Sequence, residues 1–289
     1  MIKYSLDLTT KQELRFLSDL IADLRAEIPK IDILLVGAMA RDLLLFYAHG
    51  IKATRATEDI DFAFALASWS HFEELRASLL SSDVFRPHPW GSRKLLYRRD
   101  VVVDLIPFGG LENDDGTISW PPHGDTVMSV LGFEEALKSS IDALLPVGQQ
   151  VSVVSLPMLA VLKVLAWLER RTSAPRKDAS DLMLVLQNYL DAGNSDRLYS
   201  EAAQLLENRD FDYECAGAWL AGKDALETIQ KYSLKAHRIE AILHSTLAAE
   251  TDPTGQLRLI GELMVPDPER SRRALLAFLA GFSGSQQPF

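Results

Sequence analysis

The amino-acid sequence predicts an α+β protein, in which a mixed β-sheet with flanking helices is followed by a wholly helical region. Three observations lead to this prediction. Before residue 154, short β-rich runs alternate with helical patterns of apolar residues. After that point the strand patterns stop and only helical periodicity remains. Within the first region, Asp59 and Asp61 alternate with Ile60, Phe62 and Phe64, which is typical of a strand with one apolar and one acidic face.

Length and composition are those of an ordinary globular protein. The chain has 289 residues, of which 47% are hydrophobic and 24% are charged. A chain of this length can bury one or two hydrophobic cores. We therefore predict an α/β domain over residues 1–154 and a helical domain over residues 155–289.

The composition also excludes several classes of protein. No apolar run is long enough to span a bilayer and the N-terminus lacks the layout of a signal peptide, so we expect a cytoplasmic protein with no membrane partner. The single Cys215 excludes an internal disulfide and a cysteine cluster for zinc. The formal net charge of −10 argues against a surface that binds nucleic acid over its whole extent.

The elements of both regions are predicted from apolar spacing, caps and turn residues. The first region is expected to contain helices over 10–28, 38–49, 69–80 and 133–140, and strands over 31–36, 57–64, 94–99 and 100–108, with two short strands within 141–154. Residues 50–56 and 81–91 are expected to be connections, and residues 109–125 a turn or hairpin. The second region is expected to contain helices over 156–170, 176–190, 196–208, 214–230, 234–249, 254–264 and 268–281.

A strand, a glycine turn and a helix follow one another at residues 31–49. Gly37 ends the β-rich run, and Ala38 begins the helical pattern. Backbone N–H groups at such a helix start bind phosphate without a special side chain. The turn at Gly37 and Ala38 is therefore a candidate site for a triphosphate, and Arg41 follows one helical turn later.

Three aspartates are candidate metal ligands. Alternation along a strand places Asp59 and Asp61 on one face, where they repel each other unless a cation lies between them. Asp104 is a lone carboxylate inside the apolar strand over 100–108, which begins with Asp100. Taken alone, the first pair is equally typical of a strand that faces water beside a turn, and Asp104 of a strand end that reaches solvent. Together the three carboxylates suit the magnesium ions that nucleotidyl transfer uses.

At this point the sequence resembles a known family. The order of glycine turn, helix, Asp-x-Asp strand and third aspartate strand is similar to the DNA polymerase β-type nucleotidyltransferases. The local sequence more closely resembles the AbiEii-type toxins of type IV toxin–antitoxin systems. The resemblance covers roughly residues 31–190 and rests on Thr57-Glu58-Asp59-Ile60-Asp61-Phe62, Leu162-Lys163 and Arg176-Lys177-Asp178-Ala179-Ser180-Asp181-Leu182.

The resemblance implies a role for each matching residue. Asp59, Asp61 and Asp104 would bind Mg²⁺ or Mn²⁺, and Asp104 would also take the proton of the acceptor hydroxyl. Lys163 would lie on the triphosphate of an NTP substrate, and the helical domain would complete the active-site cleft. Where the family usually has a second Gly or a Ser, this chain has Ala38, so a hydroxyl is missing and the backbone N–H remains.

The second motif of the resemblance is Lys177, Asp178 and Asp181. Asp178 and Asp181 fall on one face of the predicted helix, so Asp178 is expected to orient Lys163 or a substrate hydroxyl. For Asp181, helix capping and an ordinary salt bridge are the favoured interpretation. Lys163 lies inside an apolar run, which favours a functional role.

Three functions remain open. The first is a nucleotidyltransferase that moves an NMP from an NTP to RNA, such as a tRNA 3′ end, as a toxin with a cognate antitoxin protein. The basic clusters within 93–99 and 170–177 would contact phosphates. The second is adenylylation of a cationic antibiotic, which the negative net charge favours. The third is a degenerate module that binds a nucleotide or a partner protein without catalysis, which Ala38 favours.

Overall fold

The computed structural model describes residues 5–52, 59–89, 91, 93–98, 101–124, 126–170, 175–247 and 267–285. The chain divides into two compact units, Met1–Leu43 with Ala53–Ser155, and Leu44–Lys52 with Leu156–Phe289. The change of unit after Ser155 lies next to the predicted limit at residue 154, whereas the assignment of Leu44–Lys52 to the second unit was not predicted. A mixed sheet together with many helices confirms the α+β class.

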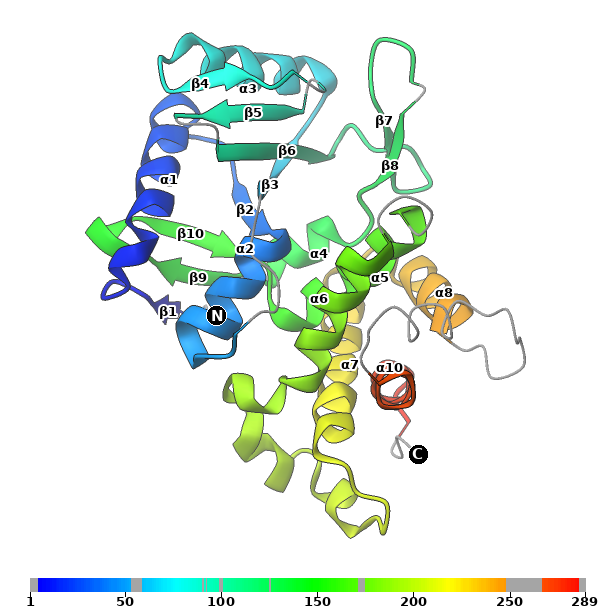
Figure 1. Cartoon of the computed structure of the whole chain (residues 1–289). Helices are drawn as coiled ribbons and strands as arrows, with labels where there is room; N and C mark the ends of the chain where they lie inside the picture. Colours follow the sequence, from blue (N-terminus) through cyan, green and yellow to red (C-terminus); the bar gives the residue numbers. More distant parts are fainter. Residues whose placement is uncertain are drawn as a thin grey trace. The chain divides into compact units, whose positions relative to one another are not determined.

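The first unit is built on an eight-stranded mixed sheet with the order β1-β9-β10-β2-β3-β6-β5-β4 (Figure 1). Three neighbouring pairs are parallel, namely β1 with β9, β10 with β2 and β3 with β6; the other pairs are antiparallel. A separate two-stranded hairpin is formed by β7 and β8. The strands are β1 (Ser5–Asp7), β2 (Ile33–Val36), β3 (Asp59–Leu66), β4 (Phe85–Pro87), β5 (Lys94–Tyr97), β6 (Val101–Gly109), β7 (Thr117–Ser119), β8 (Val127–Ser129), β9 (Ile141–Leu144) and β10 (Gln150–Val153).

One face of this sheet packs on a hydrophobic core. The apolar residues that alternate along β3, Ile60, Phe62 and Phe64, are at most 2% exposed. Helices α1 (Arg15–Glu27) and α3 (Trp69–Ser81) contact each other and lie on this side. The hydroxyl of Tyr97 in β5 donates a hydrogen bond of 2.6 Å to Asp23 of α1. The face of β3 that carries Asp59 and Asp61 is therefore the opposite one.

The opposite face is covered by shorter helices. Helix α2 (Gly37–Asp42) follows β2 directly and contacts β3. Helix α4 (Phe133–Lys138) packs on β6, where the rings of Phe133 and Phe108 lie 5.8 Å apart. Ala63, Ile106 and Phe108, which point to this face, are at most 6% exposed, so it is also largely covered.

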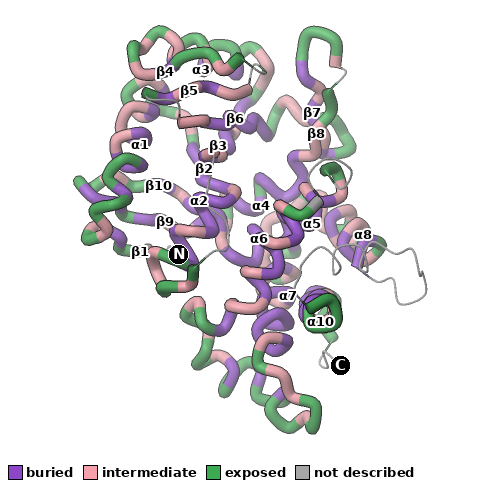
Figure 2. The backbone as a smooth tube through the Cα atoms, viewed as in Figure 1, coloured by how far each residue is buried: buried purple, intermediate pink, exposed green. Residues whose placement is uncertain are grey.

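The second unit is helical. Its longer helices are α5 (Leu156–Arg170), α6 (Pro175–Gln187), α7 (Tyr213–Tyr232), α8 (Ala236–Leu247) and α10 (Pro268–Phe282). Figure 2 shows that α5 is buried along most of its length, as its continuous apolar sequence requires. Helices α7 and α10 can approach closely because glycine has no side chain at Gly222 and Gly281. A Cβ at Gly222 would lie 2.0 Å from the carbonyl oxygen of Phe278, and a Cβ at Gly281 would lie 2.0 Å from the carbonyl oxygen of Trp219.

Some predicted elements differ from the structure. The predicted helix over 196–208 is wrong: the segment forms two 3₁₀ turns, η5 (Ser195–Tyr199) and η6 (Ala203–Glu207). They follow the π-helical turn η4 (Leu190–Asn194), in which Gly193 adopts a φ of +88° and ends regular helix. The short strands β1 and β4 were not predicted. The residues of the expected helix over 254–264, and Thr57 and Glu58 of the family resemblance, lie outside the described residues.

In the part of the chain that the structure describes, no helix combines the length and the apolar character needed to cross a membrane.

Candidate active site

The glycine turn before α2 lies directly against the side chain of Asp61. Gly37 has a φ of +70°, in the left-handed region that favours glycine. A Cβ at this position would stand 2.0 Å from Oδ2 of Asp61, so a side chain at residue 37 would displace that carboxylate. Val36, the last residue of β2, pairs with Asp61 across the antiparallel strands. The turn and the second aspartate of the Asp-x-Asp strand are therefore packed as one unit.

The three candidate metal ligands share one face of two adjacent strands. In the parallel register of β3 and β6, Asp61 is opposite Asp104, and Asp59 is opposite Val102. Neighbouring strands are about 4.8 Å apart and opposite residues point to the same side. Asp59, Asp61 and Asp104 are therefore neighbours on the face of the sheet that does not carry the core, which we call the acidic face.

Two basic side chains lie at these carboxylates. Lys94, the first residue of β5, is opposite Asp104 in the antiparallel register. Its Nζ lies 3.7 Å from Oδ2 of Asp59 and 3.8 Å from Oδ2 of Asp104. Nη2 of Arg93 lies 3.2 Å from Oδ2 of Asp104, and Nη1 lies 3.6 Å from the sulfur of Met128 in β8. The acidic face is therefore balanced by cations from the neighbouring strand and its preceding residue.

Exposure differs between the acidic and the basic groups. The side chain of Asp104 is 5% exposed and that of Asp59 is 16% exposed, whereas Lys94 is 26% and Arg93 34% exposed. The carboxylates are thus held inside the fold, and the two cations cover them from the solvent side. The two cations are therefore the more exposed members of these ion pairs.

Arg41, the predicted phosphate ligand of this turn, is buried and paired with its neighbour in α2. It is 1% exposed, and its Nε and Nη2 lie 2.9 and 2.6 Å from Oδ1 of Asp42. One partner of the guanidinium is thus the adjacent residue of the same helix, whose carboxylate balances its charge.

The residues of the acidic face fit a divalent cation in donor chemistry. Three carboxylates on one side of adjacent strands are the hard oxygen donors that Mg²⁺ and Mn²⁺ prefer. Yet among the described residues, no three acidic, histidine or cysteine side chains already form a set that would hold a metal ion. The basic side chains Lys94 and Arg93 lie at two of the carboxylates instead. Metal binding at this face therefore implies that side chains, Lys94 first, change position.

A second cluster of predicted residues lies within the helical unit. Nζ of Lys163 in α5 lies 2.6 Å from Oδ2 of Asp181 and 3.2 Å from Oδ1 of Asp178, both in α6. Arg170 adds hydrogen bonds of 2.8 and 3.0 Å to the two carboxylate oxygens of Asp178. Asp178 is 0% and Asp181 1% exposed, and Lys163 is 5% exposed. This buried cluster joins α5 to α6.

Only some residues of the two predicted basic clusters lie at the carboxylates of the acidic face. Arg93 and Lys94 border the carboxylates, but Arg98 turns to α1, where it lies 3.0 Å from Asp23. Arg170 is bound to Asp178. Lys177 is half-buried in α6. Arg99 and Arg171 lie outside the described residues.

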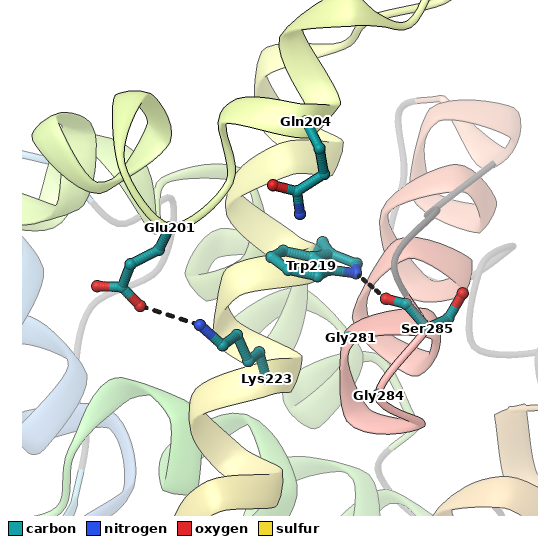
Figure 3. A pocket seen from close by; sticks show the side chains of 7 residues that line it. All are labelled: Glu201, Gln204, Trp219, Lys223, Gly281, Gly284 and Ser285. Atoms are coloured by element: carbon teal, nitrogen blue, oxygen red, sulfur yellow. Dashed lines mark hydrogen bonds and ion pairs between the residues drawn. The ribbon is translucent and has the colours of Figure 1, made fainter.

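A separate hollow of about 450 Å³ lies within the helical unit, and none of the predicted site residues lines it. Nζ of Lys223 lies 3.1 Å from Oε2 of Glu201, and the indole N–H of Trp219 donates a hydrogen bond of 2.8 Å to the carbonyl oxygen of Ser285; Figure 3 shows both pairs. The hollow is thus bordered by groups that bind one another, and its chemistry does not single out a ligand. We therefore place the candidate site on the acidic face.

Sequence reasoning missed three partners of the site residues. Lys94 and Arg93 were recognised only as a basic cluster, although the alternation along 94–97 places Lys94 on one face with Leu96. Asp181 was expected to be an ordinary capping or salt-bridge residue, whereas it is buried and is the nearer partner of Lys163. The spacing of Asp178 and Asp181 signalled a shared helix face, but no pattern showed which of them Lys163 would approach more closely.

The chain matches no protein-family model, and a comparison with curated proteins finds no relative.

Proposed function

We propose that this protein is a metal-dependent nucleotidyltransferase that moves an NMP from an NTP to an acceptor hydroxyl. The observation that carries the proposal is the acidic face, where Asp61 and Asp104 are opposite each other on parallel strands and Asp59 lies on the same side. The fit of Gly37 against Asp61 supports it, because only a residue without a side chain lets the turn before α2 approach that carboxylate so closely.

The chemistry assigns a task to each carboxylate. Asp59, Asp61 and Asp104 would hold Mg²⁺, which when bound neutralises charge on the phosphates. Asp104, the most buried of the three, would accept the proton of the acceptor hydroxyl. The acceptor oxygen then forms a bond to the α-phosphorus, the bond from that phosphorus to the bridging oxygen breaks, and pyrophosphate leaves.

The acceptor is inferred from the resemblance to AbiEii-type toxins. That resemblance favours RNA, such as a tRNA 3′ end, and a growth-arresting role opposed by an antitoxin protein. In the described part of the first unit, Arg93 is the basic group beside the carboxylates with the most exposed side chain, so it is the first candidate for a contact with an RNA phosphate.

The test is transfer of label from an α-labelled NTP to total RNA in the presence of Mg²⁺. We expect transfer by the wild-type protein and a loss of at least about a hundredfold in Asp61→Asn, because removal of a ligand charge weakens stabilisation of the reacting phosphates. Asp114→Asn, which changes an exposed carboxylate of the same unit, is the matched control and should transfer normally. Absence of transfer to any RNA would exclude the RNA acceptor, and a second assay with aminoglycosides would then test the antibiotic alternative.

A second candidate function is a nucleotide-binding module without catalysis. It is favoured by two observations: Ala38 lacks the hydroxyl of the family turn, and Lys94 and Arg93 lie on the carboxylates that would hold the metal. A thermal-shift screen with each NTP, with and without Mg²⁺, separates the two candidates. Stabilisation by an NTP with no transfer to RNA or small acceptors would favour the module.

A further inference from the structure

The acidic face carries its own cation. Lys94 is opposite Asp104 in the register of β5 and β6, and its ammonium group lies within 4 Å of two aspartates on different strands. We propose that Lys94 is the resident counter-ion of the acidic face, and that a divalent cation must displace it in order to bind. This inference rests on the proposed metal site, and it adds a residue that controls access to that site.

The distances show how Lys94 is held. Hydrogen bonds from an ammonium to a carboxylate are usually about 2.7–2.9 Å long. Nζ of Lys94 instead stands 3.7 and 3.8 Å from its partners, midway between Asp59 and Asp104. It is bound by the field of two carboxylates rather than by a short contact with one. A lysine side chain with 26% exposure that is held in this way can move out into solvent.

The ammonium group of Lys94 occupies a place where a divalent cation could bind. A cation that bridges Asp59 of β3 and Asp104 of β6 would occupy the place that Nζ of Lys94 takes in this structure. Two positive groups a few ångströms apart repel each other strongly at a partly buried site. Lys94 and a divalent cation therefore cannot both lie between the same two carboxylates.

Arg93 differs from Lys94 in this respect. Its Nη2 lies 3.2 Å from one carboxylate, that of Asp104, and its other terminal nitrogen contacts Met128. It is thus held at the edge of the acidic face by two elements, whereas Lys94 lies between the strands. Lys94 is the group that metal binding has to move.

The first experiment measures Mn²⁺ binding directly, from the loss of the electron paramagnetic resonance signal of free Mn²⁺. Wild-type protein is titrated beside Lys94→Gln, Lys94→Arg and Lys138→Gln. Lys138 is an exposed lysine of α4 in the same unit and controls for the change in net charge. We expect Lys94→Gln to bind Mn²⁺ about tenfold more tightly, because one competing charge is removed. Lys94→Arg and Lys138→Gln should bind as the wild type does.

The location of the bound ion is tested in the double variant Lys94→Gln with Asp59→Asn. Loss of the gained affinity would show that the Mn²⁺ lies on the acidic face. Affinity that stays high would show that the ion lies elsewhere and would overturn the inference. Unfolding curves of every variant, recorded without metal, identify any variant that does not fold.

A second experiment uses only the wild-type protein. Reductive methylation of its lysines is followed by mass spectrometry with and without Mg²⁺, and the peptide containing Lys138 serves as the internal reference. We expect Mg²⁺ to raise the rate of methylation at Lys94 several-fold, because the displaced ammonium enters solvent. An unchanged rate at a Mg²⁺ concentration that fills the site would overturn the inference.

The outcomes separate this inference from the proposed function. If wild type and Lys94→Gln bind Mn²⁺ equally well, the counter-ion role of Lys94 is excluded and the metal site stands. If Lys94→Gln binds Mn²⁺ and the wild type does not, the lysine blocks the site and the inference is supported. If neither binds Mn²⁺, both the inference and the proposed metal-dependent function are excluded.

Discussion

Each unit of the protein holds a lysine between two aspartates, and the two arrangements differ in distance and exposure. In the first unit, Nζ of Lys94 stands 3.7 and 3.8 Å from its partners, and 26% of its side chain is exposed. In the second unit, Nζ of Lys163 stands 2.6 and 3.2 Å from its partners, and 7% of its side chain is exposed. The same residue types therefore surround one lysine that solvent reaches and one lysine that is almost fully buried.

The difference shows that residue type does not decide what a charged cluster does. A partly exposed pair at long distance contributes little to stability, so its cation can be exchanged for another. A buried cluster in short contact resists removal of any one member, because the remaining charges are left without water or partner. We therefore interpret the acidic face as a place for ligands and the cluster around Lys163 as a link between α5 and α6.

We expect the largest loss of stability from a substitution in the buried cluster around Lys163. Asp178→Asn removes the carboxylate charge that Lys163 and Arg170 share, and we expect the free energy of unfolding to fall by about 3–5 kcal/mol. Urea unfolding of the purified protein measures the change. Asp196→Asn, at an exposed position of the same unit, should change stability by less than about 0.5 kcal/mol. Asp59→Asn should cost less than about 1 kcal/mol, and an equal loss in Asp59→Asn and Asp178→Asn would contradict the comparison.

The second-largest loss of stability is expected from a substitution in the glycine turn that packs on the acidic face. Gly37→Ala combines a φ of +70° with a Cβ placed 2.0 Å from Asp61, and we expect a loss of stability of about 2–3 kcal/mol. Gly148→Ala is the matched control, since it has a φ of +78° and no atom within 4 Å of the added Cβ. It should cost about 1 kcal/mol from backbone strain alone. Equal losses in thermal unfolding would show that the turn does not press on Asp61.

A smaller effect concerns the buried thiol of the helical unit. Burial raises the pKa of Cys215 to about 12, from an ordinary value of 9.0. Because the folded pKa is the higher one, this contribution to stability is complete below pH 9 and is lost as the pH rises from 9 towards 12. The loss amounts to about 1 kcal/mol by pH 10. The fall in unfolding free energy between pH 8 and pH 10 should be correspondingly smaller in Cys215→Ala, and equal falls in both proteins would contradict the burial of the thiol.

The smallest effect concerns an exposed charge network. Hydrogen bonds from Arg197 lower the pKa of Glu201 to about 2, and its side chain is 40% exposed. The folded pKa is depressed, so the contribution is present above pH 4.5 and is lost as the pH falls towards 2. Solvent screening limits it, and Glu201→Gln should cost less than about 1 kcal/mol at pH 7. The loss of stability should be smaller still in 1 M NaCl. A larger loss that does not change with salt would show that Glu201 contributes as a buried charge does, and would contradict this prediction.

The sequence by itself determined the alternation that places Asp59 and Asp61 opposite the apolar face of β3, because side chains point to alternate sides of any strand. It also determined the change from mixed to helical structure near residue 154, since the period of apolar residues changes there. The helix expected over 196–208 is wrong because apolar spacing does not distinguish an α-helix from the successive 3₁₀ turns that form there.

The tertiary structure decided which charges meet. The pairing of β3 with β6 brought Asp61 and Asp104 side by side, and the pairing of β5 with β6 brought Lys94 to the same place. The choice of Asp181 as the nearer partner of Lys163 likewise depends on how α5 packs against α6. Strand register and helix packing are set by the whole core, so a local pattern of residues can name the charged groups but cannot tell which of them lie within a few ångströms of each other.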